Sequence, residues 1–246
     1  MRSETVFRRG DLAALLYVGA VGLAGMALLG LSLRLVVASG RPGGEILLWA
    51  GIAILTLLAG RLSIRLPLPR CIVSFSDALI FLTALLFGPG LATITGALDG
   101  YASSARNGGT WRKRIFNSGG MALSVGLAAR LFRRVVPEAG VWGSSARVLA
   151  GIVLLAATQY VVNTALVIGA VTLNDRIAAA HVLHHSFAWA GVCNVAGTVA
   201  AACVFLAVRK LGATSCIAIL PVPVVLHLLY RAAIERWQAT KAPSRG

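Results

Sequence analysis

Residues 73–117 read VSFSDALIFLTALLFGPGLATITGALDGYASSARNGGTWRKRIFN, and this stretch decides the fold. Two apolar segments, 76–87 and 91–105, are separated by Gly-Pro-Gly at residues 88–90. Proline removes a backbone donor and clashes with the preceding turn, and glycine permits backbone angles that other residues avoid. A continuous helix through residues 88–90 is therefore disfavoured. The stretch predicts a helical hairpin or a sharp kink.

Each of the two apolar segments carries one carboxyl group, Asp77 in the first and Asp99 in the second. An ionisable side chain at membrane depth costs about 2.5–3.5 kcal/mol or more and usually faces a cavity or a partner, so both are candidate ligand-binding residues. Asp77 lies at the start of its segment, where a helix cap is the competing interpretation. For Asp99, which lies among glycines and small residues, the competing interpretation is an ion pair with Arg106 or Arg112.

The composition places the chain among polytopic membrane proteins. Of its 246 residues, 58% are hydrophobic and 13% are charged, and the mean hydropathy is +0.83. Soluble domains carry about 25% charged residues. The 23 Lys and Arg residues outnumber the 8 Asp and Glu residues, and they punctuate the loops between apolar runs without forming a basic face. This pattern indicates anchoring at the cytoplasmic membrane surface and argues against nucleic-acid binding.

A membrane-crossing helix needs about 20 apolar residues, and the chain offers eight apolar segments, two of them short. The predicted segments are 12–33, 45–60, 76–87, 91–105, 115–132, 148–173, 186–208 and 213–230. With eight spans and a cytoplasmic N-terminus, 15 basic residues fall inside and 8 outside, whereas a single kinked span over 76–105 makes the numbers 12 and 11. The positive-inside rule therefore favours eight spans with both termini in the cytoplasm. A basic cluster on the outer side is discordant and is assigned to snorkelling: Arg130, Arg133, Arg134 and Arg147.

The expected fold is accordingly all-α: a polytopic membrane protein of about eight transmembrane helices with a Gly-Pro-Gly hinged helical hairpin. Residues 1–237 form one integral membrane domain, and residues 238–246 form a disordered cytoplasmic tail. The first apolar run is too long for the hydrophobic region of a signal peptide, so we expect it to remain as the first span.

Five polar residues lie inside apolar segments and are further candidate ligand-binding residues: Asn117, Gln159, Tyr160, Asn163 and Asn194. In a helix, residues 159 and 163 stack at i, i+4, and residues 160 and 164 do so beside them, which predicts a polar stripe. Such side chains most often join membrane helices by hydrogen bonds worth about 0.6 kcal/mol on average. The alternative is a polar pocket that they share with Asp99.

The sequence predicts no metal, no cofactor and no catalytic residue. His181, His184 and His185 have spacings that a metal could use, but no acidic or cysteine partner lies nearby in sequence, so we assign them to a membrane edge. The four cysteines form no CxxC pair and are interpreted as small hydrophobic residues. A P-loop, GxSxG and HExxH are all absent, so the chain is not expected to be an enzyme.

Four motifs together resemble a known membrane region. LLFGPGLATITGAL at 85–98, RIFN at 114–117, YVVNTALV at 160–167 and LPVPVVLHLLYRAAIER at 220–236 resemble the membrane-embedded N-terminal region of bacterial HD-GYP phosphodiesterases and related diguanylate cyclases or histidine kinases. The resemblance implies a bacterial inner-membrane anchor and input module whose last helix leads into a cytoplasmic output domain. Because the sequence ends at Gly246, the resemblance does not extend to catalysis.

Residues 73–117 also resemble the substrate-binding S components of energy-coupling factor transporters, which have about six spans and dock a partner through small residues of the first helix. Ala20 and Ala24 are the small residues that match this role here. The first expectation is therefore a non-catalytic membrane sensor or anchor domain that binds a small ligand within the helix bundle. The alternative is the substrate-binding membrane subunit of a vitamin-type transporter. The expected partners are the lipid bilayer and either a cytoplasmic signalling protein or a transport ATPase complex, and a homodimer is considered as an assembly.

Overall fold

The computed structural model describes residues 9–62, 64–65, 72–73, 76–136, 145–175 and 188–211. The helices of this part are α1 (Arg9–Ala38), α2 (Gly43–Ala59), a 3-10 turn η1 (Gly60–Leu62), α3 (Ser76–Phe87), α4 (Pro89–Arg106), α5 (Trp111–Val135), α6 (Ser145–Asp175) and α8 (Ala188–Leu211). Two strands of two residues each, β1 (Ile64–Arg65) and β2 (Ile72–Val73), pair antiparallel. The described fold is therefore all-α apart from this short strand pair.

Three helices are long and apolar enough to cross a membrane, and they contain the windows Leu12–Ala38, Trp111–Val135 and Ala146–Asn174 of α1, α5 and α6. The membrane class expected from composition is confirmed at this level. The other apolar helices are shorter, and α3 has 12 residues. At about 1.5 Å per residue α3 is about 18 Å long, against about 30 Å of hydrocarbon, so α3 alone does not cross a bilayer.

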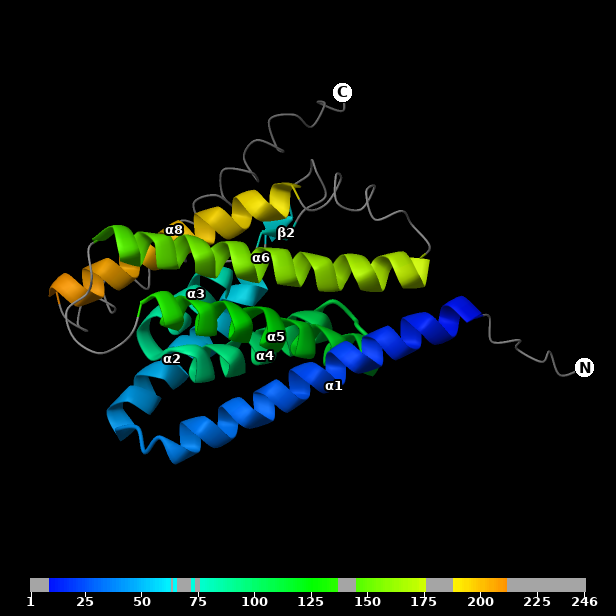
Figure 1. Ribbon diagram of the computed structural model, residues 1–246, viewed down its shortest axis with the longest axis horizontal. Coiled ribbons are helices and arrows are strands. Elements are labelled where there is room, and N and C mark those ends of the chain that lie inside the picture. The colour runs from blue at the N-terminus through cyan, green and yellow to red at the C-terminus, as the bar shows by residue number, and fades with distance from the viewer. Residues whose placement is uncertain are drawn as a thin grey trace, which may run out of the picture.

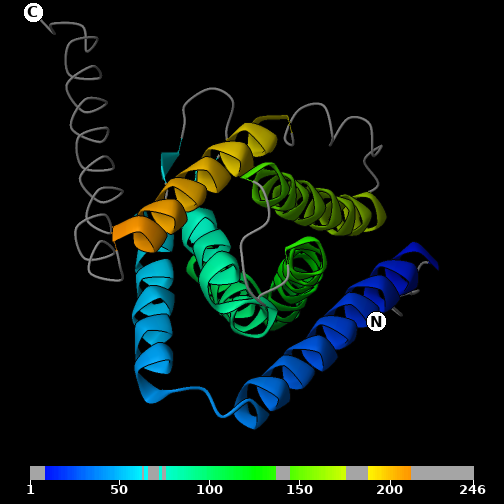
Figure 2. The same ribbon diagram turned by 60° about the vertical axis from the view of Figure 1, so that its left-hand side comes forward.

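The helices form an inner and an outer layer. Figure 2 shows α1, α2, α6 and α8 around the outside, with the α3 to α5 region in the middle, and Figure 1 shows α5 running alongside α6. Burial agrees with this arrangement, because 61% of the apolar window of α5 is buried, against 22% for α1 and 28% for α6. The outer helices consequently present apolar faces outward, as lipid contact requires.

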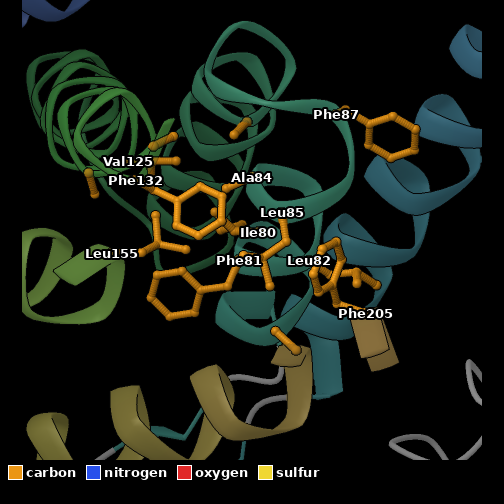
Figure 3. Close-up of a cluster of buried hydrophobic side chains, with 14 of the residues drawn as sticks. Ile80, Phe81, Leu82, Ala84, Leu85, Phe87, Val125, Phe132, Leu155 and Phe205 are labelled. Atoms are coloured by element: carbon orange, nitrogen blue, oxygen red, sulfur yellow. The ribbon is translucent and has the colours of Figure 1, made fainter. Parts of the chain in front are cut away.

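The hydrophobic core lies where α3 meets α4, α5, α6 and α8. Figure 3 shows the buried side chains of this cluster, including Phe81 of α3, Phe132 of α5, Leu155 of α6 and Phe205 of α8. All four are at most 2% exposed. Since most residues of α3 are buried, this short helix is surrounded by protein, which is the setting in which a segment too short to cross the bilayer is stable at membrane depth.

α3 and α4 are joined at Gly88. Its φ of +82° lies in the left-handed region, which glycine adopts without the Cβ clash that other residues incur. α4 then begins with Pro89 at its first position, where the missing N–H removes no helical hydrogen bond. The guanidinium of Arg133 lies against Gly88, so this member of the discordant basic cluster packs at the α3–α4 junction.

α1 crosses α5 at a pair of glycines. A Cβ added to Gly25 would overlap the backbone of Gly119, so the two helix backbones touch there. Near the same contact Arg130 donates to Gly126 O at 2.9 Å and to Ser32 Oγ of α1 at 3.3 Å. Small residues allow this close approach between membrane helices.

The small residues of this internal contact are not Ala20 and Ala24, which the transporter resemblance assigns to docking a partner. Ala20 and Ala24 lie on the exposed face of α1. The predicted span 213–230, the tail 238–246 and the histidine cluster fall outside the described residues, as do Cys71 and Cys216.

Candidate functional site

Four helices line a half-open cavity of about 230 Å³. Four of the seven residues predicted as ligand-binding line it, one from each of α3, α4, α5 and α6: Asp77, Asp99, Asn117 and Asn163. A water molecule occupies about 30 Å³ in the liquid, so the cavity has room for several waters or for one small solute. Residues that are far apart in sequence therefore form one compact site.

Asp99 is the most enclosed acidic group of the site, at 5% exposure. Ser76 Oγ at the start of α3 donates to Asp99 Oδ2 at 3.1 Å. Asp99 Oδ1 is also buried, and within the described residues it has no hydrogen-bond partner. A buried polar atom without a partner is uncommon and costs about 1–3 kcal/mol. Oδ1 lies near Arg106 and Gly60, neither of which lines the cavity.

Arg106 lies beside this carboxyl group. Its Nη2 is 3.8 Å from Asp99 Oδ1, while its Nη1 donates to Leu57 O of α2 at 3.3 Å. The ion pair that competed with a ligand-binding role for Asp99 is therefore present, in a long geometry. At that separation it supplies charge but no hydrogen bond.

Asp77 lies in the first turn of α3 and lines the same cavity. A negative charge there is favoured by the dipole of the helix. α8 passes close by, since a methyl group at Gly197 would be 3.6 Å from Asp77 Cβ. The cavity thus brings two carboxyl groups together, with Arg106 as the neighbouring guanidinium.

Asn117 and Asn163 supply amide groups on the opposite walls, from α5 and α6. Each amide offers two N–H donors and a carbonyl acceptor. Together with the acceptor atoms of the two carboxyl groups, they can bind a small solute that carries several N–H or O–H donors. The apolar remainder of the lining comes from Phe116, Met121, Leu166 and Val167.

The other three predicted residues do not line this cavity. Asn194 Nδ2 of α8 donates to Gln159 Oε1 of α6 at 2.6 Å, and both side chains are buried. Tyr160 packs beside Gly191 of α8. The stripe predicted on α6 is therefore divided, because residues 159 and 160 face α8 while Asn163 faces the cavity.

Sequence reasoning missed several lining residues, among them Ser76 and Ser103. Ser103 follows Asp99 by four residues, and Met121 follows Asn117 by four, so each pair shares one helix face. A search one helical turn beyond Asp99 and Asn117 would have identified Ser103 and Met121. Ser76 needs the tertiary contact between α3 and α4, which no local pattern supplies.

The described residues contain no group of three or more His, Cys, Asp or Glu side chains that could hold a metal ion. Cys203 is a free, exposed thiol on α8. The carboxyl and amide groups of the site can form hydrogen bonds and interact with charged groups.

No protein-family model, no curated protein and no solved structure matches the chain.

Proposed function

We propose that the chain is a non-catalytic membrane sensor or anchor domain of bacterial signalling type, which binds a small cationic solute in the cavity between α3, α4, α5 and α6. The observation that carries this proposal is the convergence of two carboxyl groups, Asp77 and Asp99, on one cavity that Asn117 and Asn163 also line. Two carboxyl groups beside one guanidinium leave an excess of acid groups. A protonated amine offers both the charge and the N–H donors that this lining accepts.

The proposed response follows from the position of the cavity. A solute that bridges four helices stabilises the arrangement in which all four approach it, and a ligand shifts a conformational equilibrium only by binding one state better than another. A cytoplasmic signalling partner would detect the resulting helix movement. The motifs at 160–167 and 220–236 support this function by their resemblance to signalling input modules.

The proposal includes the eight-span topology with both termini in the cytoplasm of a bacterial inner membrane. Its support is the distribution of basic residues and the change of direction at Gly88. In this arrangement α3 and α4 form a hairpin in which α3, although shorter than the hydrocarbon is thick, counts as a crossing because the surrounding helices shelter it from lipid.

A thermal-shift experiment tests ligand binding. The purified protein in lipid nanodiscs is heated with methylammonium, guanidinium or putrescine, and with methanol and acetate as neutral and anionic counterparts. We expect the cations alone to raise the unfolding temperature, and a ligand at 100 times its Kd adds about 2.7 kcal/mol. Asp99→Asn should abolish the shift. Glu45→Gln should retain it, because Glu45 pairs with Arg41 away from the cavity.

Equal shifts with methanol, or cation shifts that persist in Asp99→Asn, would contradict cation binding in this cavity. The sensor role is tested separately by identifying the proteins that co-purify from native membranes. An intact transport ATPase in place of a signalling protein would replace the sensor assignment with the transporter-subunit alternative.

A further inference from the structure

A second and larger cavity, of about 520 Å³, lies between α1, α5 and α6. Its lining includes the N-terminal part of α1 and the C-terminal end of α6, which lie near each other on the right of Figures 1 and 2. The two helices are tied together beside it, because Tyr17 Oη donates to Leu166 O at 3.1 Å. Its volume falls within the range of about 300–1,000 Å³ that is usual for small-molecule sites.

Most of the lining of this second cavity falls into two chemically distinct parts, and Phe116 and Asn117 of α5 and Asn174 of α6 complete it. One part is an apolar wall supplied by α1 and α6: Ala14, Leu15, Val18, Val167, Ala170 and Val171. The other is a polar end at the start of α5, formed by Thr110, Arg112 and Lys113. A ligand that satisfies both parts needs an anionic head and a hydrocarbon body.

Neither cation at the polar end forms an ion pair within the described part of the chain. The ion pairs of that part join Arg41 to Glu45 and Arg106 to Asp99. The guanidinium of Arg112 lies 5.5 Å from the ring centre of exposed Trp111. Tryptophan is enriched where a membrane meets water, which places these cations at the depth of lipid headgroups.

We propose that the second cavity binds an anionic phospholipid. The phosphate lies against Arg112 and Lys113, and one acyl chain follows the wall between α1 and α6. A basic pocket between membrane helices is suited to an anionic headgroup. A soluble phosphate compound would leave the apolar wall in water, so the lipid is the better match to the whole lining. The proposal does not depend on the occupant of the first cavity.

Native mass spectrometry of the full chain, titrated with phosphatidylglycerol or phosphatidylcholine, tests the charge requirement. We expect retained phosphatidylglycerol, and we expect Arg112→Gln/Lys113→Gln to weaken its binding about fivefold for each cation removed, or about 25-fold in total. The matched control is Arg34→Gln/Lys210→Gln, which removes two exposed cations that do not line the cavity. Equal losses in both double variants would show diffuse surface attraction and overturn the proposal.

A steric pair of variants tests the acyl-chain path while leaving the cations in place. Ala170→Phe fills the apolar wall and should reduce phosphatidylglycerol retention, whereas Val161→Phe, on the exposed face of the same helix, should not. Glycerol 3-phosphate serves as the soluble counterpart with the same phosphate chemistry. If it bound as tightly as phosphatidylglycerol, or if Ala170→Phe retained the lipid fully, the lipid assignment would be wrong.

Discussion

At the scale of single residues, α1 and α5 approach each other closely at Gly25 and Gly119. Neither position has room for a side chain on the face that meets the partner helix. Without a hydrophobic driving force between helices in lipid, such contacts hold membrane helices together by van der Waals packing. The stability of the α1–α5 pair therefore depends on the absence of two methyl groups.

Gly25→Ala should destabilise the protein, because its Cβ would overlap the Gly119 backbone. Overpacking of this kind costs about 1–3 kcal/mol. Gly30→Ala is the matched control on the same helix, with no atom within 4 Å of the added Cβ, and it should be neutral or stabilising by about 0.5–1 kcal/mol. Thermal unfolding followed by circular dichroism compares the two. Equal stabilities would show that the helices separate without cost.

At the scale of elements, α6 serves two neighbours with different parts of its surface. Gln159 bonds Asn194 of α8 in a buried amide pair, and Asn163, one turn later, lines the first cavity. α6 therefore connects a packing contact with α8 to the lining of the first cavity. α3 differs from α6, because it is short and enclosed by other helices.

A double-mutant cycle on Gln159→Ala and Asn194→Ala should give a coupling free energy of about 0.6 kcal/mol, with about 1.7 kcal/mol as the upper end for such pairs in membranes. The free energy of unfolding is measured in mixed micelles as the concentration of a denaturing detergent is increased. Gln159→Ala with Thr56→Ala is the control cycle, because Thr56 bonds only Ile52 O of its own helix in α2. That cycle should be additive within about 0.3–0.5 kcal/mol. If the coupling free energy is indistinguishable from that of the control cycle, the Gln159–Asn194 pair does not stabilise the contact between α6 and α8.

At the scale of the whole molecule, the basic residues at the ends of helices predict its orientation. Ser39 follows α1, and Asn107 follows α4; both are exposed. In the eight-span topology the first lies outside the cell and the second inside.

Cysteine labelling checks this orientation. In a background with the four native cysteines replaced by serine, Ser39→Cys should react with a membrane-impermeant maleimide on intact cells. Asn107→Cys should react only in inverted vesicles. Labelling of both positions from the same side would require an even number of crossings between them, and the hairpin at Gly88 would have to be redrawn.

Hydropathy alone predicted most of the helices, because a membrane-crossing segment must be both apolar and hydrogen-bonded along its backbone. The bounds differ at the ends: α6 covers Ser145–Asp175, where 148–173 was expected. The difference arises because helical hydrogen bonding continues into polar flanking residues that an apolar-length rule omits. The length of α3 agrees with the expectation of 76–87, yet hydropathy gave no sign that other helices enclose it.

The candidate site was predictable in part. Asp99 and Asn163 could be selected because polar groups inside apolar helices tend to face the protein interior. The sequence could not show that Gln159 faces α8 while Asn163 faces the cavity. This difference depends on where α8 packs, and no spacing along α6 encodes that position. The same limit applies to the second cavity, because Arg112 and Lys113 look like ordinary loop cations until α1 and α6 are placed beside them.

The glycine contact between α1 and α5 also has a consequence in time. Gly25 and Gly119 are 94 positions apart, and a ribosome adds about 5–20 residues per second. About 5–20 s therefore pass between the synthesis of one surface and that of its partner. During that interval the glycine face of α1 contacts lipid. The order of translation therefore sets the order in which the bundle is assembled.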